Sequence, residues 1–91
     1  MHPPIPNDPV ALALAALAAT LGSERRAQRF LDLTGIGTDE LKHRAADPGL
    51  LAALLRFLEA HEPDLLSVAE ELGVDPLDLV KARREIEQGA T

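Results

Sequence analysis

The sequence has 91 residues, a formal net charge of −6, and no cysteine, tryptophan or tyrosine. This composition excludes a disulfide framework, a thiolate metal site and a cysteine nucleophile, and the acidic balance disfavours a general nucleic-acid binder. Alanine and leucine supply 32 residues, whereas valine, isoleucine and threonine supply 11, so the sequence predicts an all-α fold. At this length we expect one domain with a modest core and no deep substrate cleft.

The chain starts with a proline-rich stretch, for which we predict a disordered tail over residues 1–7. Residues 8–91 are expected to form a single helical domain. Acid-proline pairs predict helix starts, because aspartate caps free amides and proline at the first helical position loses no hydrogen bond. These pairs are Asp8-Pro9, Asp47-Pro48, Glu62-Pro63 and Asp75-Pro76, and the expected stops are Gly22, Gly35, Gly73 and Gly89. The predicted helices cover residues 9–21, 24–34, 39–46, 48–61, 63–72 and 76–88.

The first predicted helix contains the apolar run VALALAALAATL over residues 10–21, which has the length of a signal-peptide core. The residues before it carry no lysine or arginine, and Asp8 stands near its start. Because signal peptides need positive charge there, we interpret the run as a buried helix and expect a cytoplasmic protein. No apolar run approaches the ~20 residues that span a bilayer, so no membrane contact is expected.

Apolar residues form a stripe along one side of most of the predicted helices. In the first helix this stripe comprises Val10, Leu14, Leu17 and Leu21. The helix over 48–61 is apolar around most of its circumference, which is typical of a helix with neighbours on several sides. We therefore predict a compact bundle of five to six short helices around this central Leu-rich helix. Leu12 and Leu66 fall outside the stripes and are candidates to line an exposed groove or a dimer interface.

The segment over 63–88 has the pattern of a helix-turn-helix pair. Ala69 is the small residue inside the first helix, and Gly73 stands four residues later at the turn. The pair is poorly suited to binding DNA, because Asp75 and Asp78 stand where bases and phosphates would be contacted, and phosphates repel carboxylates. We predict a helix-turn-helix that serves packing, with DNA binding as the alternative.

Four basic residues are the candidate partner-binding positions: Arg25, Arg29, Arg56 and Arg84. Arg25, Arg26 and Arg29 form the densest basic cluster and are expected on the exposed side of the second helix. Arg25 and Arg29 share a face one turn apart and could clamp an acidic or phosphorylated partner. The other interpretation is a solvated face paired to Glu24 and Asp32. Arg56, on the central helix, is expected to reach the rim of the core or to pair with a carboxylate such as Glu59.

The cations of the last helix are expected to be neutralised within that helix. Lys81, Arg83 and Arg84 have acids three or four positions away, namely Asp78, Glu85 and Glu87. This local pairing is a further reason to disfavour contact with phosphates.

No pattern of a catalytic or metal site is present in the sequence. The acids and histidine at Glu59, His61, Glu62 and Asp64 lack the spacing of a helical zinc motif. The two serines are not in a glycine-flanked elbow, and the GIG at 35–37 lacks the residues of a phosphate loop. We therefore expect no enzyme, no cofactor and no metal.

Three segments resemble a known family: RFLDLTGIG (29–37), DPGLLAALLRFL (47–58) and HEPDLLSVAEELGVDPLDLVKAR (61–83). The family consists of short, all-helical alphaproteobacterial proteins that form a domain of unknown function, and the resemblance covers about residues 8–86. It implies a bacterial cytoplasmic protein with an all-α fold. It implies no activity, cofactor or catalytic residue.

Two functions follow as hypotheses. The first is a non-enzymatic module that acts through protein contacts, either by self-association or by docking to a larger partner, because the apolar content is large for the chain length. The alternative is a helix-turn-helix regulator that binds DNA. A small molecule in the bundle interior ranks third, because alanine-lined helices pack closely.

Overall fold

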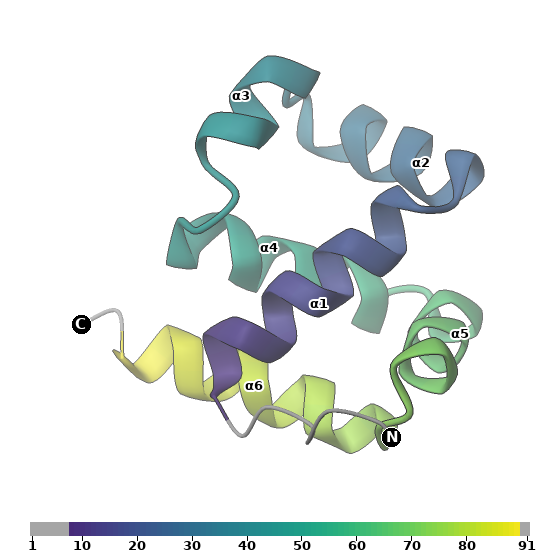
Figure 1. Cartoon of the computed structure of the whole chain (residues 1–91), viewed down its shortest axis with the longest axis vertical. Coiled ribbons are helices and arrows are strands. Elements are labelled where there is room, and N and C mark those ends of the chain that lie inside the picture. The colour runs from purple at the N-terminus through teal and green to yellow at the C-terminus, as the bar shows by residue number, and fades with distance from the viewer. Residues whose placement is uncertain (1–7, 90–91) are drawn as a thin grey trace, which may run out of the picture.

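Six helices make up most of residues 8–89, the part of the chain that the computed structural model describes (Figure 1). They are α1 (Pro9–Leu21), α2 (Glu24–Thr34), α3 (Thr38–His43), α4 (Pro48–Glu59), α5 (Glu62–Leu72) and α6 (Pro76–Gly89). No strand occurs within these residues, so the predicted all-α fold is confirmed. The tail predicted over 1–7 lies outside the described residues, and the single domain over 8–91 stays a prediction.

Three of the four acid-proline starts follow the predicted capping chemistry. At the fourth the prediction is wrong, because His61 is the N-cap of α5 without a side-chain cap bond, and Glu62 is the first helical residue. Asp8 and Asp47 are extended, and their carboxylates accept hydrogen bonds from the amides of Val10 (3.0 Å) and Gly49 (3.3 Å). At α6 the caps are reciprocal: Asp75 accepts from the amide of Leu77, and the Asp78 carboxylate accepts from the amide of Asp75. This reciprocal pair is a capping box, which satisfies two amides that the helix itself leaves free.

Two helices are shorter than the sequence predicts. α3 ends at His43, three residues before the predicted end at residue 46, because Arg44 leaves the helical conformation (φ −109°, ψ 14°). The Arg44 guanidinium then bonds both Glu40 (3.2 Å) and Asp47 (2.8 Å), which joins the end of α3 to the cap of α4. α4 ends at Glu59 rather than residue 61, because His61 is extended as the N-cap of α5.

The core forms where α1, α4, α5 and α6 meet, while α2 and α3 occupy one end of the molecule (Figure 1). α4 packs against α1, α5 and α6 and buries seven of its 12 residues, as the prediction of a central helix requires. α1 contacts α2, α4, α5 and α6, so it shares the central position. Ala13 and Ala16 of α1 are fully buried, and their small side chains let neighbouring helices approach closely.

The buried face of α1 differs from the stripe predicted from its leucines. It comprises Leu12, Ala13, Ala16, Leu17 and Thr20. The prediction that Leu12 lines an exposed groove is therefore wrong, since this side chain is buried, whereas Leu66 is 48 % exposed as expected. Leucines lie on both sides of α1, and only the helices packed around it select the buried side. The hydroxyl of buried Thr20 donates to the carbonyl of Ala16 (2.8 Å), so this side chain is hydrogen-bonded inside the core.

The predicted glycine stops have two different conformations. Gly35 and Gly73 are left-handed, both with φ 70°, as expected of residues that end a helix. Gly22 also follows the last residue of its helix, as predicted, but it is right-handed (φ −73°), so the turn after α1 does not require glycine. The predicted stop at Gly89 is wrong, because Gly89 is still part of α6.

Replacing Gly73 by alanine is expected to lower the free energy of unfolding by about 1 kcal/mol, because an L side chain is strained at φ 70°. Gly37→Ala is the matched control: its φ is −78°, and an added Cβ would have no heavy atom within 4 Å. Urea denaturation of both variants measures the difference. Equal stability of the two would contradict a strained turn at Gly73.

Candidate functional site

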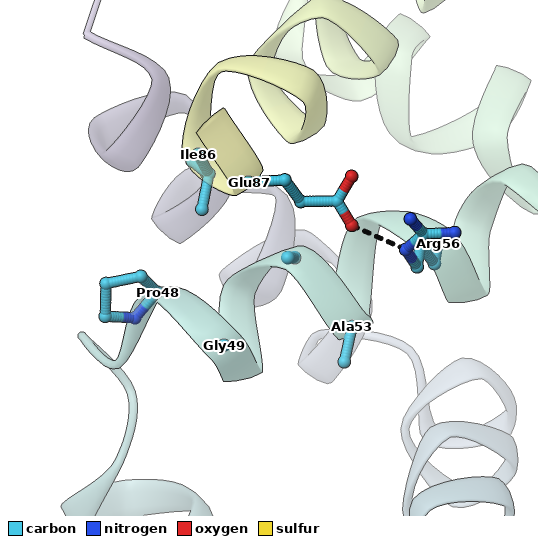
Figure 2. A pocket seen from close by; sticks show the side chains of 7 residues that line it. Pro48, Gly49, Ala53, Arg56, Ile86 and Glu87 are labelled. Carbon is cyan, nitrogen blue, oxygen red and sulfur yellow. Dashed lines mark hydrogen bonds and ion pairs between the residues drawn. The ribbon is translucent and has the colours of Figure 1, made fainter. Parts of the chain in front are cut away.

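A groove open to solvent runs along α4, from its first turn to Arg56 in its last, beside the last turn of α6 (Figure 2). Its volume is about 420 Å³. Five apolar or small residues line it together with one charged residue from each helix: Pro48, Gly49, Ala52, Ala53, Ile86, Arg56 and Glu87. We call this feature the α4–α6 groove. Its lining is mostly apolar, and its charged groups stand at one end, as is usual for binding sites on proteins.

The sequence of α4 explains why the groove exists. Gly49, Ala52 and Ala53 recur at the spacing of one helical face and carry no side chain beyond Cβ. The large leucines of α4 point to other helices and fill the core. α6 brings Ile86 against this face, and Ile86 is nearly buried (5 % exposed). Small residues on one helix beside a branched residue on the next leave a hollow between them.

Ion pairs join the groove to a larger network between α4 and α6. Arg56 donates from Nε to Glu87 Oε2 (2.6 Å), and Arg83 donates to the other Glu87 oxygen (2.6 Å). Arg83 also donates from Nε to Glu59 (2.5 Å). Arg56 therefore pairs with a carboxylate, which was one of the two expectations for it, but the carboxylate is Glu87 rather than the suggested Glu59, which Arg83 binds instead. Side chains 31 positions apart meet here, which helical spacing could not predict.

The pKa of Glu87 lies below its ordinary value of 4.5, first because Arg56 donates to its carboxylate and second because Arg83 does so. A lowered pKa in the folded state stabilises the fold above the unfolded-state pKa, and this stabilisation is lost as the pH falls through the folded value. We expect Glu87→Gln to be less stable than the unmodified protein at pH 7 and equal to it near pH 2. Urea midpoints across this pH range test the expectation, and a constant difference would contradict it.

Arg25 and Arg29 come together on α2, as predicted, but their carboxylate partner was not predicted. Arg29 donates to Asp64 of α5 (2.6 Å), and Arg25 stands 3.7 Å from the same carboxylate. Asp64 is 2 % exposed. The expected pairing with Asp32 is wrong, because Asp32 accepts from Gln28 (2.8 Å) instead. These two arginines therefore help to hold α2 on α5, although the Arg25 side chain remains 76 % exposed.

Arg26 was placed on an exposed face by sequence reasoning, and this placement is wrong, because it is 8 % exposed. Its guanidinium donates to Ser67 (3.0 Å), to Glu71 (2.7 Å) and to the carbonyl of Ala19 (3.0 Å). Its Nε is buried without a partner in the described part of the chain. Arg26 lies one turn before the buried Phe30 on the same face of α2, so helical spacing could have indicated its burial. Ser67 and Glu71 of α5 supply the polar groups that let an arginine occupy this face.

Arg84 is exposed on α6 and has no ion pair within residues 8–89, and the same holds for Lys81. The expected neutralisation is confirmed only for Arg83, because Asp78 caps α6 and Glu87 bonds Arg56 and Arg83. The four predicted partner-binding arginines thus occupy three places. Arg25 and Arg29 are beside Asp64, Arg56 is in the α4–α6 groove, and Arg84 is on the outer face of α6.

Two of the four side chains considered for a metal site are held by arginine: Glu59 by Arg83 and Asp64 by Arg29. Within residues 8–89 no group of three or more histidine, aspartate or glutamate side chains is placed to hold a metal ion. None of the six helices is both long and apolar enough to cross a membrane.

Comparison with known proteins gives one match. The family model described as "Protein of unknown function (DUF3572)" covers residues 6–89. No curated protein and no solved structure matches the chain. The family match extends over the six helices and both walls of the α4–α6 groove, and the chain belongs to the DUF3572 family.

Proposed function

We propose that the protein acts without catalysis, as a small helical module that docks another protein in the bacterial cytoplasm. The observation that carries this proposal is the α4–α6 groove, a hollow of about 420 Å³ whose lining is mostly apolar and whose charged residues stand at one end. Covering apolar surface is favourable because it removes that surface from water. The concave shape lets a partner's side chain be covered on several sides, which a flat patch does not.

Exposed leucines give further apolar surface, and the three most exposed of them stand on three different helices. Leu33 of α2 is 72 % exposed, Leu77 of α6 63 % and Leu66 of α5 48 %. Scattered apolar residues of this kind are ordinary on protein surfaces. The groove is therefore the stronger candidate for a docking site, and these leucines are secondary candidates for self-association.

Ala53→Gln tests the proposal, because Ala53 is half-buried and lines the groove. Glutamine adds length and polarity there without changing the charge, and it is compatible with a helix. We expect this variant to capture its partner from a host lysate about tenfold less than the unmodified protein. Ala18→Gln is the matched control, because Ala18 is exposed in the middle of α1 and outside the groove, and capture should be unchanged.

Light scattering on the same three proteins reports self-association. An oligomer that Ala53→Gln dissociates would show that the docked protein is a second copy. Equal capture by both variants, or a strict monomer that captures nothing, would overturn docking through the groove. Circular dichroism of each variant confirms that the helices are intact.

Binding of DNA through α5 and α6 is a second candidate, favoured by one observation. Lys81 and Arg84 stand on the exposed face of α6 without a carboxylate partner in residues 8–89, and the left-handed Gly73 forms the turn before that helix. A gel-shift experiment on genomic fragments at low salt tests it, because phosphate contacts are strongest there. A shift that Lys81→Ala and Arg84→Ala both reduce would support DNA binding, and no shift would exclude it.

A further inference from the structure

The lining of the α4–α6 groove extends along more than two turns of α4, farther than one side chain of a partner would cover. Its lining follows α4 from Pro48 to Arg56, which is about 12 Å along the helix axis at the usual rise per residue. Gly49 and Ala53 are four positions apart on this line, and neither has a side chain that would keep a second backbone away. An added Cβ at Gly49 would meet only the Asp47 carboxylate, at 3.7 Å or more. An amphipathic helix places aliphatic side chains at this same spacing.

The groove is lined by one arginine and one glutamate, and of the two only the arginine has hydrogen-bonding atoms outside their ion pairs. Both oxygens of Glu87 already accept hydrogen bonds, one from Arg56 and one from Arg83. Arg56 makes this bond through Nε, which leaves its two terminal nitrogens outside the bond, and its side chain is 62 % exposed (Figure 2). A guanidinium has five N–H donors, and its terminal pair suits a carboxylate. A partner that brings a hydrogen-bond acceptor such as a carboxylate is therefore favoured at this end of the groove over a partner that brings a cation.

We infer that the α4–α6 groove binds an acidic amphipathic helix of a partner protein, with two aliphatic side chains one turn apart on Gly49 and Ala53 and a carboxylate on Arg56. The inference rests on the proposed docking function and adds the chemistry of the partner. The carboxylate selects the partner and its orientation, while the aliphatic side chains provide most of the buried area. Because Arg56 is exposed, its pairing contributes selectivity of a few-fold rather than the bulk of the affinity.

Three labelled peptides of about 16 residues test the inference, a length at which an alanine-based helix is partly formed in water. The first carries two leucines four positions apart and a glutamate one turn beyond them. The second has lysine in place of the glutamate, and the third has alanine in place of both leucines. Fluorescence anisotropy measures their binding to the full chain and to Ala53→Gln, Arg56→Gln and the control Ala18→Gln.

We expect the glutamate peptide to bind about fivefold more tightly than the lysine peptide, and Arg56→Gln to remove that difference. Ala53→Gln should weaken all binding, the alanine peptide should not bind, and Ala18→Gln should change nothing. Equal binding of the glutamate and lysine peptides, no effect of Arg56→Gln, or no binding of any peptide would overturn the inference. The docking function is tested separately, since lysate capture that depends on Ala53 but not on Arg56 would retain docking and reject an acidic helix.

Discussion

Leu54→Ala is expected to lower the free energy of unfolding by about 3 kcal/mol, as is usual for a leucine lost from a closed core. Leu54 is fully buried on α4, and α4 packs against α1, α5 and α6 at the same time. The neighbouring helices cannot all move to fill the space that the leucine leaves. The total free energy of unfolding of a domain of this size is about 4–12 kcal/mol, so this single loss is a large part of its stability. Urea denaturation followed by circular dichroism measures it.

Leu66→Ala is the control for this prediction, because it removes the same atoms from a side chain that is 48 % exposed on α5. Its expected cost is under about 1 kcal/mol, since little apolar surface is returned to water. Equal losses at Leu54 and Leu66 would contradict the placement of α4 at the centre of the core.

Asp64→Ala is expected to lower the free energy of unfolding by about 2 kcal/mol and to loosen α2. Removing one partner of a buried ion pair costs about 3–5 kcal/mol when the remaining charge stays buried. The Arg29 side chain is 35 % exposed and can turn to water, which reduces the cost. Asp64 also stands in the first turn of α5, where a negative charge favours the helix. In this variant the rate of amide hydrogen exchange should rise more in α2 than in α4.

Asp39→Ala is the matched control for Asp64, because Asp39 also stands in the first turn of a helix but is exposed and has no ion pair within the described range. Its expected cost is about 0.5 kcal/mol, from the helix dipole alone. If the two variants lose the same stability, or if exchange in α2 is unchanged in Asp64→Ala, the arginines do not hold α2 on α5.

The starts of α1, α4 and α6 were predictable from sequence because their chemistry is local. Asp8, Asp47 and Asp75 each cap a helix through an amide two positions away, and proline follows each of them. The buried face of α1 was not predictable, since leucine and alanine stand on all sides of that helix. Arg26 was misplaced because a charged side chain is usually exposed, whereas here α5 supplies Ser67 and Glu71 around it.

The candidate site was predictable only in part. The small residues Gly49, Ala52 and Ala53 are visible in the sequence of α4, and Arg56 was chosen as a partner-binding residue. The other wall of the groove comes from Ile86 and Glu87, more than thirty positions later in the chain. Only the packing of α6 on α4 brings the two walls together, and local spacing carries no information about it.

Photo-crosslinking in the living host tests docking through the α4–α6 groove most directly. A diazirine-bearing residue is placed at position 53 in one variant and at position 18 in another, and the cross-linked products are compared by mass. We predict one defined partner protein, cross-linked at position 53 and absent at position 18. The same products at both positions, or none at position 53, would contradict docking through the α4–α6 groove.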